Sequence, residues 1–248
     1  AQGAPPVMVR RPLVFFPADD EAAAAKARMD PPSHGGKTYY IDSVAGSNAN
    51  TGLSEAQAWK DFEKVNGTAL GPGDALLLRR GSVFNEELSV SAHGTPDNWA
   101  VIGAYGEGPR PIIRRNWDID DRCVLITDPD YLRISSLVVC FAGKGLVTHY
   151  GGAGHRGLLI EDCIAHHIEG LYRPNAHGIP EWLDRRGARG DGLSTSAGIG
   201  ISVAPAEDIV MRNCEMFQTF SGFFVTGDGV VLDRLYRKDN YVRNAAQQ

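Results

Sequence analysis

The sequence predicts an all-β solenoid, in which short strands stack turn upon turn along one axis. A six-residue pattern of apolar, variable, apolar, polar, polar and apolar residues occurs four times, and a shorter strand-like segment precedes each copy. The copies return about every 22 residues, with one longer interval. A period of this length, with short alternating strands and no helical pattern, is typical of a parallel β-helix. The four patterns are residues 132–137, 158–163, 209–214 and 230–235, and the preceding segments are residues 124–127, 146–149, 201–204 and 223–226.

The repeat also predicts which side chains stack on one another. Because successive side chains of a strand point to opposite faces, alternate positions form inward apolar columns and outward polar columns. The outward column alternates in charge, and we interpret it as a surface salt-bridge ladder rather than a functional site. Each exposed pair in such a ladder contributes less than about 1 kcal/mol. The predicted inward columns are Leu132, Leu158, Ile209 and Val230, and Ile134, Ile160, Met211 and Leu232; the outward column is Ser135, Glu161, Arg212 and Asp233.

Two of the four cysteines, Cys163 and Cys214, occupy the same slot in consecutive copies of the repeat. The register therefore places them on neighbouring turns, about 4.8 Å apart. A disulfide is one interpretation, and an internal ladder of small apolar side chains is the one that we favour. No Cys or His spacing of the kind that holds zinc is present in the sequence.

Composition limits the classes of function. The chain has 248 residues, of which 43% are hydrophobic, so it can build a large single core. A net charge of −5 without a basic stripe argues against nucleic acid as a partner. No apolar run approaches the roughly 20 residues that a membrane span needs.

We expect two regions in the chain. Residues 1–37 form an N-terminal arm with a capping helix, since acidic residues precede an alanine-rich stretch there. Residues 38–248 form the β-helix, with about six rungs and an insertion at about 172–197. A short helix is also expected at residues 55–65, with Trp59 and Phe62 buried. The last rung is begun and not finished, so we expect either a longer protein or a partner chain that covers its open edge.

Several short motifs stand in the first half of the chain. They are Tyr-Tyr-Ile-Asp at residues 39–42, Asn-Thr-Gly-Leu-Ser at 50–54, Ala-Trp-Lys at 58–60, Pro-Gly-Asp at 72–74, Arg-Gly at 80–81 and the stretch 102–111. Together they resemble the opening of secreted right-handed parallel β-helix proteins of the pectate-lyase-like superfamily, which contains polysaccharide lyases and glycoside hydrolases. The resemblance implies a right-handed β-helix, export to the extracellular space or periplasm, and a polysaccharide or oligosaccharide as partner.

The insertion and the histidines before it are the predicted site. Long polar insertions in regular solenoids are often functional, although a solvated loop or a partner contact is the alternative. His167 and Glu169 are two positions apart on one strand face, which suits an acid/base group and its orienting carboxylate, unless the histidine only closes a turn. Consecutive histidines are expected on opposite faces. The predicted catalytic residues are His167, Glu169, Asp184 and Asp191; the predicted substrate-binding residues are His149, His155, Tyr172, Arg173, Trp182, Arg185 and Arg186.

Three functions fit these residues. Hydrolysis of a glycosidic bond needs two carboxyl groups, whereas elimination on a uronic-acid polymer needs a base and a charge-neutralising cation. We favour hydrolysis slightly, because the chain is mildly acidic and Lys144 is the only lysine near the predicted site. A non-catalytic glycan-binding or adhesive β-helix is the third interpretation. The loop from Asp42 to Asn50 offers oxygen atoms for calcium, but an Asx turn is favoured there.

Overall fold

Short strands stacked in parallel make up the structure. The computed structural model describes residues 33, 35–117, 121–168, 171–172, 199–219, 221–238 and 243–244. Its strands are β1 (Thr38–Ile41), β2 (Ala69–Leu70), β3 (Ala75–Arg79), β4 (Val83–Phe84), β5 (Leu88–His93), β6 (Ala100–Tyr105), β7 (Ile112–Arg114), β8 (Arg122–Asp130), β9 (Leu132–Ser135), β10 (Val138–Ala142), β11 (Lys144–His149), β12 (Arg156–Glu161), β13 (Ile164–Ile168), β14 (Leu171–Tyr172), β15 (Ile199–Arg212), β16 (Glu215–Thr219), β17 (Ser221–Asp228), β18 (Val231–Asp233), β19 (Tyr236–Lys238) and β20 (Arg243–Asn244).

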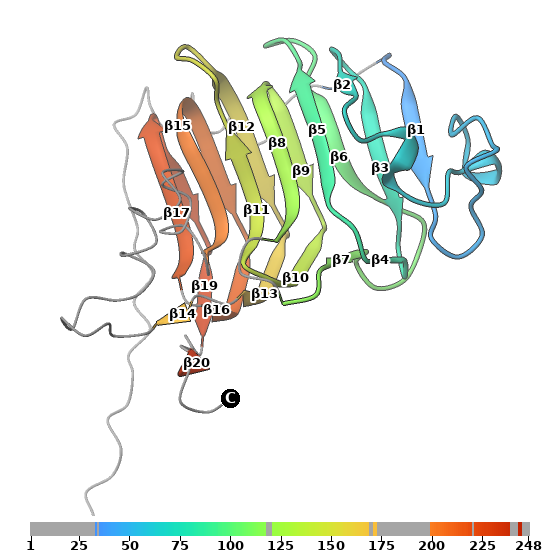
Figure 1. Cartoon of the computed structure of the whole chain (residues 1–248). Coiled ribbons are helices and arrows are strands. Elements are labelled where there is room, and N and C mark those ends of the chain that lie inside the picture. Colours follow the sequence, from blue (N-terminus) through green and yellow to red (C-terminus); the bar gives the residue numbers. More distant parts are fainter. Residues whose placement is uncertain are drawn as a thin grey trace, which may run out of the picture.

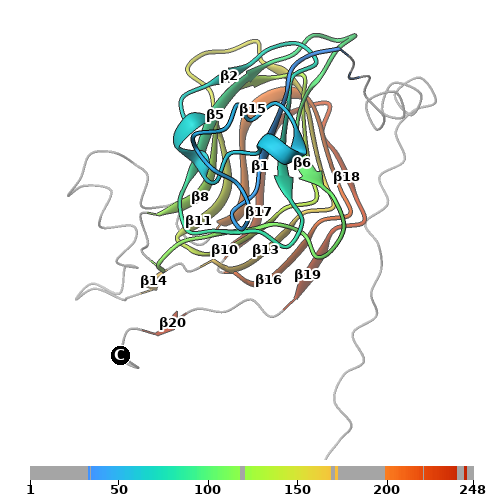
Figure 2. The same cartoon turned by 90° about the vertical axis from the view of Figure 1, so that its right-hand side faces the viewer.

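Within the described residues, every pairing between named strands is parallel. One ladder runs β1-β3-β6-β9-β12-β15-β18, a second runs β2-β5-β8-β11-β15-β17, and a third runs β4-β7-β10-β13-β16-β19. The long strand β15 takes part in the first two. Figure 1 shows the strands side by side along one axis. Seen along that axis, β8 and β11 face β6 and β18 across the interior, and β10, β13 and β16 close a third side (Figure 2).

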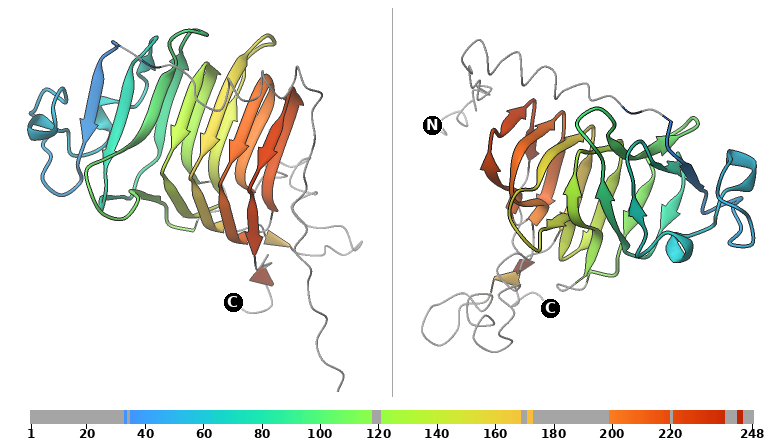
Figure 3. Two further views of the ribbon diagram at one scale, coloured as in Figure 1. Left: turned by 180° about the vertical axis from the view of Figure 1, so that it is seen from behind. Right: turned by 90° about the horizontal axis from the view of Figure 1, so that it is seen from above.

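The register of these ladders matches the sequence repeat. Leu158 pairs with both Leu132 and Ile209, and Glu161 pairs with both Ser135 and Arg212. Views from behind and from above show the same regular stacking (Figure 3). The predicted all-β fold with parallel strands is therefore confirmed.

Other parts of the fold prediction are not supported by the described residues. The N-terminal capping helix within residues 1–37 lies almost wholly outside them, as does most of the insertion at 172–197. The count of about six rungs is not established, because both ends of the stack are described only in part. None of the helical segments described here has the length and apolar character that a membrane-spanning helix requires.

The predicted helix at residues 55–65 is wrong. Two 3₁₀ turns, η1 (Glu55–Gln57) and η2 (Phe62–Lys64), stand in its place. The backbone of Trp59 lies between them and bonds to β1: its N–H donates to the Tyr40 carbonyl, and its carbonyl accepts from the Asp42 N–H. A backbone paired in this way cannot continue a helix. Phe62 is fully buried as expected, whereas Trp59 is only partly buried.

The chain turns between ladders at residues with positive φ, most of which are not glycine. These residues recur five positions apart within a turn and at matching positions in successive turns. A left-handed residue reverses the local direction of the strand without needing a loop. Because most of them are not glycine, the sequence carried no clear sign of these corners. The corner residues are Tyr131, Gly157, Asp208 and Gly229 at the first corner; Ser136, Asp162, Asn213 and Arg234 at the second; and Phe141, His167 and Gln218 at the third.

The interior is filled by the inward columns. Most of their side chains are fully buried, including Leu132, Leu158, Ile209 and Ile160. Leu232 is an exception, since it keeps its register with Met211 but is 39% exposed on the last strand of its ladder within the described residues.

The cysteines are part of that interior, and each of the four is buried and free. The prediction of an internal cysteine ladder is confirmed. The hydrogen bond with Cys214 and burial raise the pKa of the Cys163 thiol, and burial raises the pKa of Cys140 to about 11. The thiols of Cys163 and Cys140 are therefore protonated at neutral pH, which makes them poor nucleophiles.

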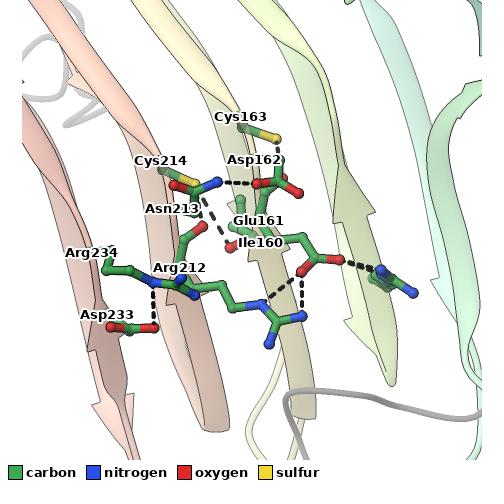
Figure 4. Close-up of polar contacts among 10 residues, drawn as sticks. Ile160, Glu161, Asp162, Cys163, Arg212, Asn213, Cys214, Asp233 and Arg234 are labelled. Carbon is green, nitrogen blue, oxygen red and sulfur yellow. Dashed lines mark hydrogen bonds and ion pairs between the residues drawn. The ribbon is translucent and has the colours of Figure 1, made fainter.

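The outward column differs from the predicted surface ladder. Glu161 is almost fully buried and lies between two arginines (Figure 4). Its Oε1 accepts from Arg133, with Nη2 at 2.5 Å, and its Oε2 accepts from Arg212, with Nη2 at 2.5 Å. The Nε atoms of both arginines also donate to it. Asp233 does not extend this clamp but pairs with Arg234 at 3.1 Å. The clamp thus joins three adjacent strands, β9, β12 and β15.

We expect the Glu161→Gln variant to lower the free energy of unfolding by about 2 kcal/mol, because a neutral amide leaves two partly buried guanidinium groups without their counter-charge. Urea denaturation measures this loss. The matched control is Asp233→Asn, whose ion pair is more exposed and whose effect should stay within about 0.5 kcal/mol. Equal effects of the two variants would contradict a buried clamp.

Substitutions at Ser136 test whether the left-handed backbone at this corner is strained. Its φ is 61°, so Ser136→Gly should stabilise the fold by about 0.5 kcal/mol, and Ser136→Val should destabilise it by about 1–2 kcal/mol. Thermal denaturation of the two variants gives the comparison. A valine variant as stable as the glycine variant would show that this corner carries no conformational strain.

Candidate functional site

The described structure gathers chemistry-bearing side chains in two places. The first is the imidazole–carboxylate cluster, made of Asp128, Asp130, Tyr150 and His155 at the ends of β8 and β11. The second is the ring surface, made of Trp117, Phe141, His166, His167 and Phe217 on and beside β10, β13 and β16.

In the imidazole–carboxylate cluster, His155 lies between two carboxylates. Its Nδ1 is 3.0 Å from Oδ2 of Asp130, and its Nε2 is 3.4 Å from Oδ1 of Asp128. Both carboxylates also accept backbone N–H groups, Asp130 from Arg156 at 3.1 Å and Asp128 from Gly151 at 2.6 Å. These contacts anchor the loop that joins β11 to β12.

Tyr150 completes this cluster. Its ring stacks on that of His155, with centroids 4.8 Å apart. Burial raises the pKa of Tyr150 to about 12, so the phenol stays neutral. The predicted substrate-binding residue His149 is exposed at the end of β11 and pairs through its backbone with Thr127. The carboxylates of Asp128 and Asp130 are therefore already hydrogen-bonded to groups of the protein itself.

The ring surface forms a continuous network of aromatic and imidazole rings. His166 stacks on Phe217 with centroids 4.8 Å apart and an angle of 7° between the planes. Phe141 lies 4.9 Å from His167, and Trp117 lies 4.9 Å from Phe141. The residues come from successive turns, because Cys140 pairs with His166, and His166 pairs with Phe217.

His166 and His167 lie on the same side of their strand, contrary to the expectation that they point to opposite faces. Their Nδ1 atoms are 2.7 Å apart. The cause is the left-handed backbone of His167, with φ of 52°, which interrupts the alternation of the strand. One imidazole of the pair must therefore donate and the other accept.

The surroundings of His166 favour its neutral form. Burial, together with the positive charge that His167 can carry, lowers the pKa of His166 to about 4. Above that pH the His166 ring is an uncharged hydrogen-bonding group. The ring surface thus combines apolar ring faces with the uncharged imidazole of His166.

Of the predicted site residues, His149, His155 and His167 are described with their side chains. His167 belongs to the ring surface and His155 to the imidazole–carboxylate cluster, so the structure does not bring these two together in one described cluster. Tyr172 is described only as part of β14. The remaining predicted residues, which stay predictions because they lie outside the described residues, are Glu169, Asp184, Asp191, Arg173, Trp182, Arg185 and Arg186.

Sequence reasoning missed most members of both clusters. Asp128 and Asp130 follow a predicted strand and carried no motif. The pairing of His166 with Phe217 was available from the repeat, since the same offset that aligns Cys163 with Cys214 aligns these two residues. Trp117 and Phe141 lie at corners, where the alternating pattern is interrupted.

The loop predicted to offer oxygen atoms for calcium uses one of them for its own backbone. Oδ1 of Asp42 accepts from the N–H groups of Val44 at 2.9 Å and Ala45 at 3.1 Å, the geometry of an Asx turn. In the described ranges, no group of three or more His, Cys, Asp or Glu side chains is arranged to hold a metal ion.

Comparisons with known proteins point to carbohydrate-active relatives. No family model matches the chain. A lacto-N-biosidase from Bifidobacterium longum subsp. longum is 35% identical over 130 residues, which cover 42% of this chain and 8% of that protein. The chain thus spans less than a tenth of the length of this curated relative.

The solved structures add evidence on the fold. The crystal structure of GH136 lacto-N-biosidase from Eubacterium ramulus is 22% identical, with a TM-score of 0.56, and the overlap covers 83% of this chain and 41% of that one. An alginate lyase from Paenibacillus sp. overlaps with a TM-score of 0.34, too low to establish a common fold. The chain therefore shares its fold with the solved lacto-N-biosidase.

The lowered pKa of His166 predicts a pH dependence of stability. The unfolded chain takes up this proton near pH 6.5, whereas the folded chain takes it up near pH 4. The unfolded state therefore binds more protons between these values, and the free energy of unfolding falls as the pH drops through this window. After allowance for solvent screening, we expect a loss of about 1 kcal/mol.

The His166→Phe variant should lack this part of the acid destabilisation, because phenylalanine cannot bind the proton. Urea denaturation of both proteins at pH 7 and pH 4.5 gives the difference, and a histidine NMR titration locates the proton directly. If the wild type and the variant lose the same stability over this range, His166 is not the group responsible.

Proposed function

We propose that this chain is part of a carbohydrate-active enzyme that hydrolyses glycosidic bonds, with an activity of the lacto-N-biosidase type. The observation that carries the proposal is the 35% identity to a lacto-N-biosidase over 130 residues. The common fold with a second lacto-N-biosidase supports it. Parallel stacking suits this chemistry, because side chains of successive turns lie at spacings comparable to those of neighbouring sugar units.

The catalytic carboxyl groups are proposed to be among Glu169, Asp184 and Asp191. Hydrolysis needs two carboxyl groups, about 5–5.5 Å apart for retention of configuration or about 6.5–9.5 Å apart for inversion. All three candidates follow His167 in sequence, and the strand that holds His167, β13, ends at Ile168. Asp128 and Asp130 are less suitable, because His155 and backbone N–H groups already occupy their oxygen atoms.

Charge around the ring surface favours hydrolysis over elimination. An enzyme that eliminates on a uronic-acid polymer needs a base and positive charge for the substrate carboxylate. Arg114, which pairs in register with Cys140, donates to Asn85 Oδ1 at 2.6 Å. Arg115 pairs with Asp121 at 3.3 Å. The carboxylate of Asp121 balances Arg115, whereas Arg114 has a neutral partner and keeps its charge. One such guanidinium is less positive charge than the basic groove that a polyanion favours.

Three further properties stay predictions. They are export from the cell, a requirement for calcium, and a partner chain or further sequence that completes the solenoid. Each is compatible with a glycoside hydrolase. None of them is needed for the assignment of the reaction.

The test is incubation of the full chain with a panel of oligosaccharides that includes neutral glycans and uronic-acid polymers. We expect new reducing ends without unsaturated products that absorb in the ultraviolet. Asp184→Asn and Asp191→Asn should each lower turnover by at least about a hundredfold while the melting temperature is unchanged. Glu169→Gln and His167→Ala test the neighbouring predicted residues in the same assay.

Unsaturated products would show that the reaction is elimination and not hydrolysis. Binding without products would indicate a glycan-binding protein. Asp233→Asn serves as the control, because this carboxylate lies on β18 and pairs with Arg234. If all four site variants keep full activity, the assignment of the catalytic residues is wrong, even if the protein hydrolyses glycosidic bonds.

A further inference from the structure

We propose that the ring surface is a sugar-binding subsite in which Trp117 is the stacking platform for an uncharged pyranose unit. The proposal rests on the proposed function and deepens it, since it names a contact surface and a class of ligand. It concerns binding alone and assigns no catalytic step to these residues.

The first observation is the backbone of Trp117. This residue has φ of 64°, a conformation that is rare for a bulky side chain. Its N–H donates to the carbonyl of Phe141 at 2.8 Å, which holds the strained backbone in place. The result is an indole that is 37% exposed instead of packed into the core. Strained residues of this kind are concentrated at ligand-binding positions.

The second observation is the support beneath the indole. Its ring lies 4.9 Å from that of Phe141 and 5.6 Å from that of His167, the latter at 85°. His166 and Phe217 extend this support along the stack. A ring fixed by neighbours on successive turns loses little conformational entropy when a ligand binds to it.

The third observation is a set of polar atoms beside these rings. Within the part of the chain that the structure describes, neither the indole N–H of Trp117 nor Nε2 of His166 or His167 has a hydrogen-bond partner, since the contact between the two imidazoles uses Nδ1. Pyranose rings present an apolar face and a rim of hydroxyl groups. Such a ligand can stack on the indole and satisfy the nitrogen atoms at its edge.

The class of sugar follows from charge. The His166 ring is neutral above about pH 4, because burial lowers its pKa. Of the nearby arginines, Arg115 is neutralised by Asp121, whereas Arg114 donates to the neutral side chain of Asn85 and keeps its charge. The aromatic faces of the ring surface favour the CH face of an uncharged sugar and do not compensate a buried carboxylate.

The experiment is a binding titration of the full chain, by calorimetry and by intrinsic tryptophan fluorescence, with neutral oligosaccharides and uronic-acid oligosaccharides. We expect neutral oligosaccharides to bind and to change the fluorescence. Trp117→Ala should weaken this binding about tenfold, which corresponds to about 1.4 kcal/mol. Trp117→Phe should retain part of the affinity, because it keeps a stacking ring but removes the indole N–H.

The matched control is Phe224→Ala, which removes a ring that is 53% exposed on β17, outside the ring surface. The Phe224→Ala variant should bind neutral oligosaccharides with the affinity of the wild type. Melting temperatures establish that all variants are folded. Unchanged affinity in folded Trp117→Ala, equal losses in both alanine variants, or no binding of neutral oligosaccharides would each overturn the subsite. Binding that depends on Trp117 without hydrolysis would support the subsite and overturn the proposed hydrolase function.

Discussion

The fold depends on the left-handed residues that turn the chain from one ladder to the next. They recur five positions apart, and their equivalents in successive turns lie in register, as Ser136, Asp162, Asn213 and Arg234 do. Each corner costs conformational strain, since most of these residues carry a side chain. Hydrogen bonds along the parallel ladders and the buried inward columns offset that strain. Changing the spacing of the corners would shift every column behind them.

The same backbone constraint creates the ring surface. At the third corner the left-handed residues are Phe141, His167 and Gln218, and each one is the second-last residue of its strand. The left-handed conformation brings two consecutive side chains to one side, so each turn can present a pair of rings. The candidate site is therefore an outcome of the repeat at one of its corners. Its rings come from turns that are distant in sequence and adjacent in space.

Outward positions serve two different purposes in this structure. At the second corner, Glu161 binds two arginines across three strands and is almost fully buried, which makes it a structural ion cluster. At the third corner, the outward groups are aromatic and imidazole rings, whose Nε2 atoms have no hydrogen-bond partner among the described residues. Charge pairing inside the protein removes a group from ligand chemistry, whereas neutral and partly exposed groups remain available for a sugar.

The sequence by itself determined the parallel stack, the inward columns and the interior position of Cys163 and Cys214, because alternation and a fixed period are local properties of the chain. It also predicted His167 as a site residue, and this role stays a prediction. Only the tertiary structure decided that Glu161 is buried, that His166 and His167 meet on one side, and that Trp117 joins them. Positive φ at a residue other than glycine leaves no mark in the sequence. Burial and contacts between turns arise only when residues far apart in the chain are brought into register.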